Sequence, residues 1–264
     1  MNRDAFPLVL VHGGAHGAWC WEPLRPHLQT PAVAVDLPPA AIRGVPRTEA
    51  PSEIATIGVA AFATSVLADA DAAGLERFVL VGHSMGGLTI AEVARRAPER
   101  VAHLVFVSCL IPPDGGSTID ALPAELRDLT RQAVEEIRAG GLPMGALDEP
   151  TIRRMFCNDM DDTQTAFVLA HCGTEAPAAF VDPVSRADIP AALPKTYVRL
   201  RQDQALTPAD QDRQIANLRA SPGGPLDIVD LDTGHDVMIS APSQLAPLLD
   251  QIARRAATGP GPPT

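Results

Sequence analysis

The stretch Phe78-Val79-Leu80-Val81-Gly82-His83-Ser84-Met85-Gly86-Gly87 decides the fold, because it joins an apolar run to a helical pattern through a glycine-rich turn. The run 78–81 is typical of a strand covered on both faces. Residues 85–97 have the pattern of a helix, which Pro98 ends. The turn between them reads Gly-x-Ser-x-Gly, which predicts a strained nucleophile elbow.

Ser84 is the candidate nucleophile on this turn. Gly82 and Gly86 leave room where the backbone is crowded, and the helix N-terminus behind Ser84 favours developing negative charge. The motif alone is frequent by chance, so the strand before it and the helix after it carry the prediction. In the alternative interpretation, Ser84 merely caps the helix.

Short apolar runs alternate with longer amphipathic stretches on both sides of the elbow. This alternation predicts the α/β class: a doubly wound, mostly parallel sheet of about six strands, with ligands at the carboxyl ends of the strands. The predicted strands are 7–11, 32–35, 78–81, 104–107, 196–200 and 226–229, and the predicted helices are 18–28, 52–73, 85–97, 208–219 and 244–257.

Residues 113–190 interrupt this alternation, because they contain no clear strand. Helical patterns occur there instead, over 124–139, 150–156 and 162–171. We expect a helical cap over a core made of residues 1–112 and 191–257, while an ordinary packed helical excursion is the alternative. The Gly- and Pro-rich tail 258–264 is predicted to be disordered.

Composition excludes several classes of partner and location. The 264 residues carry 21 Lys+Arg against 32 Asp+Glu, a net charge of −11, which argues against nucleic acid and anionic membranes as partners. The apolar run 5–11 is too short for a signal peptide, and no run is long enough to span a membrane. Four cysteines without a Cys-x-x-Cys pair favour reduced thiols, and we expect a cytoplasmic protein. A single lysine and many alanines and prolines are typical of a GC-rich bacterial genome.

The loop after the first predicted strand reads His12-Gly13-Gly14-Ala15-His16. A serine nucleophile needs two N–H donors for the oxyanion, one from the residue that follows the nucleophile and one from an early loop. Met85 and Gly14 are therefore the predicted oxyanion donors. His12 and His16 are four residues apart, but no third ligand accompanies them, so no metal is expected.

The general base is predicted to be a late histidine, because the chain order in this fold is serine, acid, histidine. Only His235 follows the last predicted strand. The acid should follow the strand before it, which makes Asp203 the candidate, to fix the tautomer of His235. Asp230 and Asp232 lie nearer to His235 in sequence but belong to the last strand and its exit.

At these residues the chain resembles the α/β-hydrolase superfamily, and within it the plant methylesterase and hydroxynitrile lyase group and its bacterial esterase relatives. The resemblance lies in residues 10–21, 82–87, 155–160 and 202–204. It implies a compact core, a helical cap, the triad Ser84, Asp203 and His235, and an oxyanion hole from Gly14 and Met85. The lyases of the group differ, with a threonine at the position of Gly13 and a lysine at that of Asp236.

The sequence therefore predicts a serine carboxylic-ester hydrolase that acts on methyl or other small-alcohol esters of hydrophobic acids without a cofactor. The alternative is a tailoring hydrolase of secondary metabolism, acting on a lactone, a methyl ester or a C–C bond. A lyase or a low-turnover ligand receptor fits the residues less well. A homodimer stays open.

The cap is expected to select the substrate without taking part in the chemistry, and Asp159 and His171 are its candidate polar participants. The residues predicted to line the pocket are Gly13, Met155, Phe156, Phe167 and Phe180.

Overall fold

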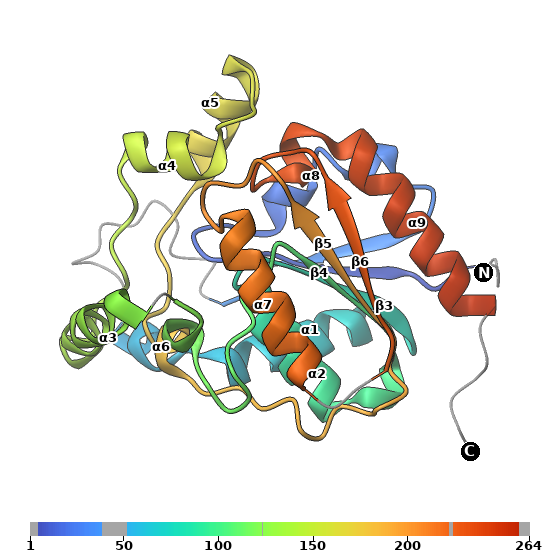
Figure 1. The fold of residues 1–264 in the computed structure, drawn as a ribbon, viewed down its shortest axis with the longest axis horizontal. Coiled ribbons are helices and arrows are strands. Elements are labelled where there is room, and N and C mark those ends of the chain that lie inside the picture. The colour runs from blue at the N-terminus through green and yellow to red at the C-terminus, as the bar shows by residue number, and fades with distance from the viewer. Residues whose placement is uncertain (1–4, 39–51, 123, 222–223, 259–264) are drawn as a thin grey trace.

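Six parallel strands form the sheet of the protein, in the order β2-β1-β3-β4-β5-β6 (Figure 1). The computed structural model describes residues 5–38, 52–122, 124–221 and 224–258. Each of the six predicted strands is present, and the α/β class is confirmed. The strands are β1 (Leu8–Val11), β2 (Ala32–Val35), β3 (Phe78–His83), β4 (Val101–Val107), β5 (Lys195–Leu200) and β6 (Leu226–Leu231).

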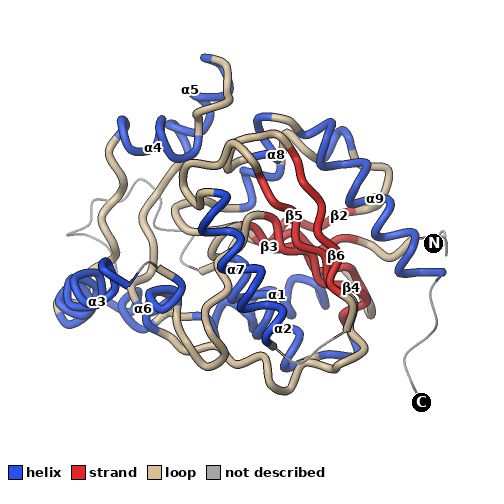
Figure 2. The backbone as a smooth tube through the Cα atoms, in the orientation of Figure 1, coloured by secondary structure: helices blue, strands red, loops and turns tan. Residues whose placement is uncertain are grey.

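Helices cover both faces of this sheet (Figure 2). Those of the core are η1 (Ala18–Trp21), η2 (Arg25–His27), η5 (Ser52–Thr56), α1 (Val59–Ala72), α2 (Gly86–Arg96), η6 (Pro98–Arg100), α7 (Pro208–Ala220), α8 (Val237–Ser240) and α9 (Pro242–Thr258). Thr258 therefore ends a helix, and the rest of the predicted tail, 259–264, lies outside the described residues.

Two predicted helices are wrong in detail. The stretch 18–28 forms two short 3₁₀ turns, because Pro23 and Pro26 lack the N–H groups that a continuous helix needs. The stretch 52–73 is divided by Gly58, whose extended backbone begins α1. Asp182, from a distant part of the chain, accepts a hydrogen bond from the Val59 N–H at 3.1 Å and so takes the place of a local cap.

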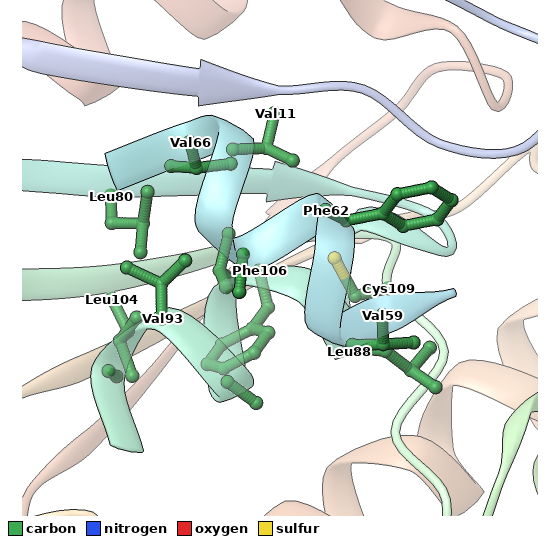
Figure 3. Close-up of a cluster of buried hydrophobic side chains, with 14 of the residues drawn as sticks. Val11, Val59, Phe62, Val66, Leu80, Leu88, Val93, Leu104, Phe106 and Cys109 are labelled. Carbon is green, nitrogen blue, oxygen red and sulfur yellow. The ribbon is translucent and has the colours of Figure 1, made fainter. Parts of the chain in front are cut away.

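The core consists of two apolar clusters on opposite faces of the sheet, since alternate residues of each strand belong to different clusters. One cluster packs against α1, α2 and α7, and Figure 3 shows part of it. The other packs against η1, α8 and α9. Val9, Val11, Leu80, Leu104 and Phe106 face the first cluster, and Leu8, Leu10, Val79, Val81, Val105 and Val107 face the second.

The segment between β4 and β5 has no strand among its described residues. It contains η7 (Thr118–Ala121), α3 (Ala124–Ala139), α4 (Glu149–Phe156), α5 (Asp162–His171) and α6 (Ala178–Val181), so its three predicted helices are confirmed. In Figure 1, α4 and α5 lie on one side of the segment and α3 and α6 on the other. Phe156 packs into the cluster that contacts η1, α8 and α9 (the α9-side cluster), and Ala179 packs into the one that contacts α1, α2 and α7 (the α1-side cluster). This segment therefore bridges the two faces of the sheet.

The structure also bears on the cysteines and on membrane-spanning helices. All four cysteines lie in the described part of the chain, and none of them forms a disulfide bond there. Within the described ranges, no helix combines the length and apolar character that crossing a bilayer requires.

Candidate active site

Ser84 occupies a strained turn between β3 and α2, as the sequence predicts. Its φ angle of 52° lies in the left-handed region that non-glycine residues rarely adopt. Backbone hydrogen bonds hold it there: its N–H donates to the Val107 carbonyl at 3.1 Å, and its carbonyl accepts from Gly87 and Leu110, also at 3.1 Å. Gly86 has no room for a side chain, because a Cβ atom there would lie 2.7 Å from the carbonyl oxygen of His12. The Ser84 hydroxyl makes no hydrogen bond to any residue that the structure describes.

Asp203 and His235 meet at the carboxyl ends of β5 and β6. His235 Nδ1 lies 2.6 Å from Asp203 Oδ2, and the two residues are 1% and 2% exposed. The second carboxylate oxygen of Asp203 accepts from the N–H groups of Ala205 and Leu206, both at 2.8 Å. Asp203 is thus the acid partner of His235 in this structure, and its carboxylate is fully hydrogen bonded.

The carboxylates that compete with Asp203 in the sequence are engaged or exposed. Asp230 is paired with Arg199, whose Nε lies 2.7 Å from Asp230 Oδ1. Asp232 is exposed, and its carbonyl accepts from the side chain of Gln202.

Ser108 is a site residue that the sequence reasoning missed. Its hydroxyl donates to Asp203 Oδ2 at 2.6 Å, and it is fully buried with a φ angle of 41°. The signal was available in principle, because Ser108 is the first polar residue after the apolar strand β4, at the sheet edge where the other site residues gather.

Charges around His235 shift its pKa. Burial disfavours the imidazolium, but the attraction and hydrogen bond of Asp203, with a contribution from Asp236, outweigh burial and raise the pKa above its ordinary value of 6.5. The His235 side chain therefore binds a proton more readily than an exposed histidine.

Asp236 belongs to a buried polar cluster with His16 and His83, which the sequence reasoning did not foresee. Asp236 is completely buried, and its Oδ2 accepts from His16 Nε2 at 2.9 Å. Burial disfavours its charge, but its histidine neighbours outweigh this effect and lower its pKa. His83 Nε2 donates to the carbonyl of His235 at 3.1 Å, and burial with the repulsion of His235 holds the pKa of His83 well below 6.5.

The loop after β1 lies against the nucleophile. A Cβ atom at Gly13 would lie 2.7 Å from the Cβ of Ser84 and 3.0 Å from the His83 carbonyl oxygen, so a glycine permits this approach. A Cβ atom at Gly14 would lie 2.6 Å from the sulfur of the flexible Met85 side chain. His12 Nδ1 donates to the Gly13 carbonyl at 2.8 Å, while its Nε2 accepts from the Leu37 N–H at 3.0 Å. These bonds fix the Gly13–Gly14 peptide beside Ser84 and Met85.

A cavity of about 10 Å³ lies beside this loop, which is room for about one water molecule. Of the predicted pocket residues only Gly13 lines it, together with both predicted oxyanion residues. The sequence reasoning did not identify its apolar wall. The lining comprises His12, Gly13, Gly14, Leu37, Val59, Phe62, Met85, Gly86, Leu88, Thr89, Glu175 and Ala179.

The other predicted pocket residues lie elsewhere in the cap. The Phe156 ring stacks on His235, with ring centres 5.6 Å apart and an angle of 22° between the planes. Phe167 packs edge-on against Trp19 at 5.5 Å, and Met155 packs against the α9-side cluster. Phe180 is half-buried in α6.

The two polar residues singled out in the cap have different surroundings. His171 is exposed, and its Nδ1 donates to the carbonyl of Phe167 at 2.7 Å. Asp159 accepts the Gly234 N–H at 2.6 Å, directly beside His235.

One group of potential metal ligands occurs in the described ranges. His83, His235 and Asp236 offer ligand atoms within 4.8 Å of one another. His235 and Asp236 form the hydrogen bonds to Asp203 and His16 described above, and His83 bonds to the His235 carbonyl. His83 Nδ1 and Asp236 Oδ1 are buried without a hydrogen-bond partner among the described residues.

Comparisons with known proteins agree with the fold. A model of the alpha/beta hydrolase family matches residues 8–248. Methylesterase 3 of Arabidopsis thaliana is 34% identical over 110 residues, which are 40% of either chain. Methylesterase 7 of the same plant is 28% identical over 97% of this chain and 98% of its own. The solved structure of an extracellular alpha/beta-hydrolase from a Paenibacillus species gives a TM-score of 0.77 at 22% identity, covering 94% of this chain and 99% of the other, a likeness of fold.

Proposed function

We propose that Ser84, His235 and Asp203 form the catalytic triad of this chain, which belongs to the alpha/beta hydrolase family and is a hydrolase of esters. The observation that carries the proposal is the 2.6 Å contact between His235 and a fully hydrogen-bonded Asp203. Ser84, held at positive φ, belongs to the same edge of the sheet, because its N–H bonds to Val107 and the next residue, Ser108, bonds to Asp203. A strained serine next to a buried histidine–carboxylate pair is the arrangement that nucleophilic acyl transfer requires.

In the first half of the reaction, Ser84 Oγ attacks the ester carbonyl while His235 Nε2 accepts its proton. Asp203 accepts from Nδ1, which keeps Nε2 unprotonated for this role, and stabilises the imidazolium that forms. The N–H groups of Gly14 and Met85 stabilise the tetrahedral oxyanion. By holding the Gly13 carbonyl, His12 orients the peptide that carries the Gly14 N–H.

In the second half, His235 donates its proton to the departing alcohol, and the acyl group remains on Ser84. A water molecule, activated by the same histidine, then releases the acid. The protein groups that act in these two half-reactions are side chains and backbone amides.

The substrates we propose are methyl or other small-alcohol esters of hydrophobic acids. Leu37, Val59, Phe62 and Leu88 give the cavity beside the oxyanion loop an apolar wall, although its volume of about 10 Å³ has room for only about one water molecule. The carboxylate of Glu175 lines it too and would repel an anionic group. The names of the relatives Methylesterase 3 and Methylesterase 7 support the small alcohol.

Two residues speak against lyase activity of the kind found in hydroxynitrile lyases. At Gly13, where those enzymes carry threonine, a side chain would collide with Ser84. At Asp236, where they carry lysine, this chain places a buried carboxylate, which cannot stabilise a departing anion.

A labelling and turnover experiment tests the proposal. A fluorophosphonate probe should label the wild type and leave Ser84→Ala unlabelled. A panel of methyl, aryl and lactone esters should be hydrolysed by the wild type, with the highest kcat/KM for small-alcohol esters. His235→Ala should lose about 10⁴-fold in kcat, because the triad acts as a unit. Labelling of Ser84→Ala, or full turnover without His235, would disprove the triad.

A further inference from the structure

The cap segment between α4 and α5 contacts both loops that carry the proposed acid and base. Asn158 Nδ2 donates to the carbonyl of Gln202 at 2.8 Å, and Asp159 Oδ2 accepts the N–H of Gly234 at 2.6 Å. Gln202 and Gly234 directly precede Asp203 and His235. Two consecutive cap side chains therefore bind the backbone one residue ahead of each member of the pair.

These contacts add to a backbone link between the same two loops. The Gln202 N–H donates to the Thr233 carbonyl at 2.9 Å, and its side-chain amide donates to the Asp232 carbonyl at 3.3 Å, so the loops are also tied directly. Gly234 is buried, so its N–H would be left without an acceptor if Asp159 were removed, and a buried unpaired donor is unfavourable. The position of His235 thus depends on a carboxylate from the cap.

Gly234 is suited to this close approach. A Cβ atom there would lie 2.7 Å from Asn158 Oδ1 and would collide with the Asp159 carboxylate. From the same cap segment, the Phe156 ring stacks on the imidazole of His235. Asp159 therefore binds the backbone of this loop, and Phe156 packs against the ring of His235.

We propose that Asn158 and Asp159 are positioning residues, which hold the acid and base loops in register so that the triad is aligned only while the cap is seated. The proposal rests on the proposed function of Ser84, His235 and Asp203. Neither residue needs to touch the substrate, because each acts through a backbone group next to the reacting pair. The cap then contributes to the rate as well as to substrate selection.

The decisive variant is Asp159→Ala, assayed on a small activated ester such as p-nitrophenyl acetate. We expect kcat to fall by about 10- to 100-fold with KM nearly unchanged, since small misalignments of reacting groups have effects of this size. The rate constant for labelling of Ser84 by a fluorophosphonate should fall in parallel. The downfield NMR resonance of the His235 Nδ1 proton should shift or broaden.

Matched variants separate positioning from loss of structure. Asp159→Asn keeps an oxygen that can accept from Gly234 and should recover most of the rate. Asp161→Ala removes the N-cap of α5, whose side chain accepts from Gln164, and so loosens the cap without touching either loop. Its rate should exceed that of Asp159→Ala at equal or lower thermal stability.

A double-mutant cycle with Gly234→Ala tests the contact itself. The added methyl group should displace Asp159 and reduce kcat on its own. In the Asp159→Ala background its cost should be smaller than in the wild type, because the contact with Asp159 is already lost and only Asn158 is left to disturb. Additive losses would overturn the proposal.

Other outcomes would also overturn it. In the first, Asp159→Ala keeps its rate, its labelling and its Nδ1 proton signal within twofold of the wild type. In the second, Asp161→Ala reproduces the losses of Asp159→Ala in full. Failure of the proposed function would look different: Ser84→Ala would then be labelled or active, or the wild type would not hydrolyse esters. The labelling rate and the proton signal test the positioning role even with no known natural substrate.

Discussion

Two carboxylates, of Asp203 and Asp236, act on His235, the proposed general base, and should set the pH range in which it can activate Ser84. Asp203 contacts its Nδ1, and Asp236 is the next residue in the chain. Both charges raise its pKa above 6.5 against the effect of burial. The general base must be neutral to accept a proton, so activity should fall as the pH drops through this raised pKa, and the acid limb of kcat/KM should lie above pH 6.5.

Replacing Asp236 by Asn should move this acid limb to lower pH. The change removes one of the negative charges that favour the imidazolium, so His235 loses its proton more readily. The pH profile of kcat/KM for a small ester measures the effect. Asp232→Asn is the control, because Asp232 is exposed and should leave the limb in place. An acid limb that stays unchanged in Asp236→Asn would contradict the assignment of Asp236.

Ser108→Ala should lower kcat by about tenfold and leave KM nearly unchanged. The substitution removes the hydroxyl that donates to Asp203 Oδ2, and hydrogen bonds to charged groups contribute about 1.5–3 kcal/mol. The loss stays moderate because Ala205 and Leu206 still hold the other oxygen. Steady-state kinetics with Ser185→Ala as a control, at a serine bonded to Asp114, check this; equal rates for wild type and Ser108→Ala would refute it.

The sequence indicates the residues of the proposed site where chain order and local pattern carry the information. Ser84 has a motif, and Asp203 and His235 follow recognisable strands. Ser108 and Asp236 have no such mark, because their roles depend on which side chains meet at the sheet edge. Phe156 was assigned to a pocket wall from its apolar character, whereas its contact with His235 depends on how the cap is seated.

The elbow between β3 and α2 has little tolerance for added volume, because backbone atoms surround Gly86. Gly86→Ala should lower the free energy of unfolding by about 1–3 kcal/mol, because the new methyl group would press on backbone carbonyls that cannot move aside. Gly145→Ala is the matched control, since a Cβ atom there meets nothing within 4 Å. Urea denaturation measures both, and similar stabilities of the two variants would contradict this account of the elbow.

The elements themselves were predicted well wherever an uninterrupted apolar run or helical pattern exists. All six strands agree within a few residues. The first four predicted runs are uninterrupted because strands covered on both faces have few polar positions, whereas β6 exposes Asp227 and Asp230. The exceptions have local physical causes. Pro23 and Pro26 prevent a regular helix, and Gly58 ends one segment because Asp182, more than a hundred residues away, caps the next.

The molecule as a whole should lose stability as the pH falls below 6.5. Burial lowers the pKa of His83 well below that value, and burial lowers the pKa of His103 to about 4. Below pH 6.5 the unfolded chain protonates both residues while the folded protein keeps them neutral, so acid favours unfolding. His235, with its raised pKa, is protonated in both states in this range and adds no slope.

Between pH 6 and 5 each of the two histidines should reduce the free energy of unfolding by about 1.4 kcal/mol per pH unit. Urea denaturation at several pH values measures the slope. His103→Gln should remove about half of it, because His103 is one of the two histidines, and it lies near the start of β4, away from the carboxyl end of the sheet where the proposed triad is. A stability that is flat over this range would show that neither histidine is held neutral.

Because the backbone at Ser84 is strained, enzymatic turnover should also report the fraction of molecules that is folded. The positive φ angle of Ser84 is maintained by hydrogen bonds to Val107, Gly87 and Leu110, and Val107 belongs to the central strand β4. The serine cannot relax to a comfortable backbone without breaking these bonds, so the reactive geometry and the intact sheet should vanish together on heating. Units of activity in a preparation should then count folded molecules, and a stored sample that has lost half of its turnover should have lost half of its native protein.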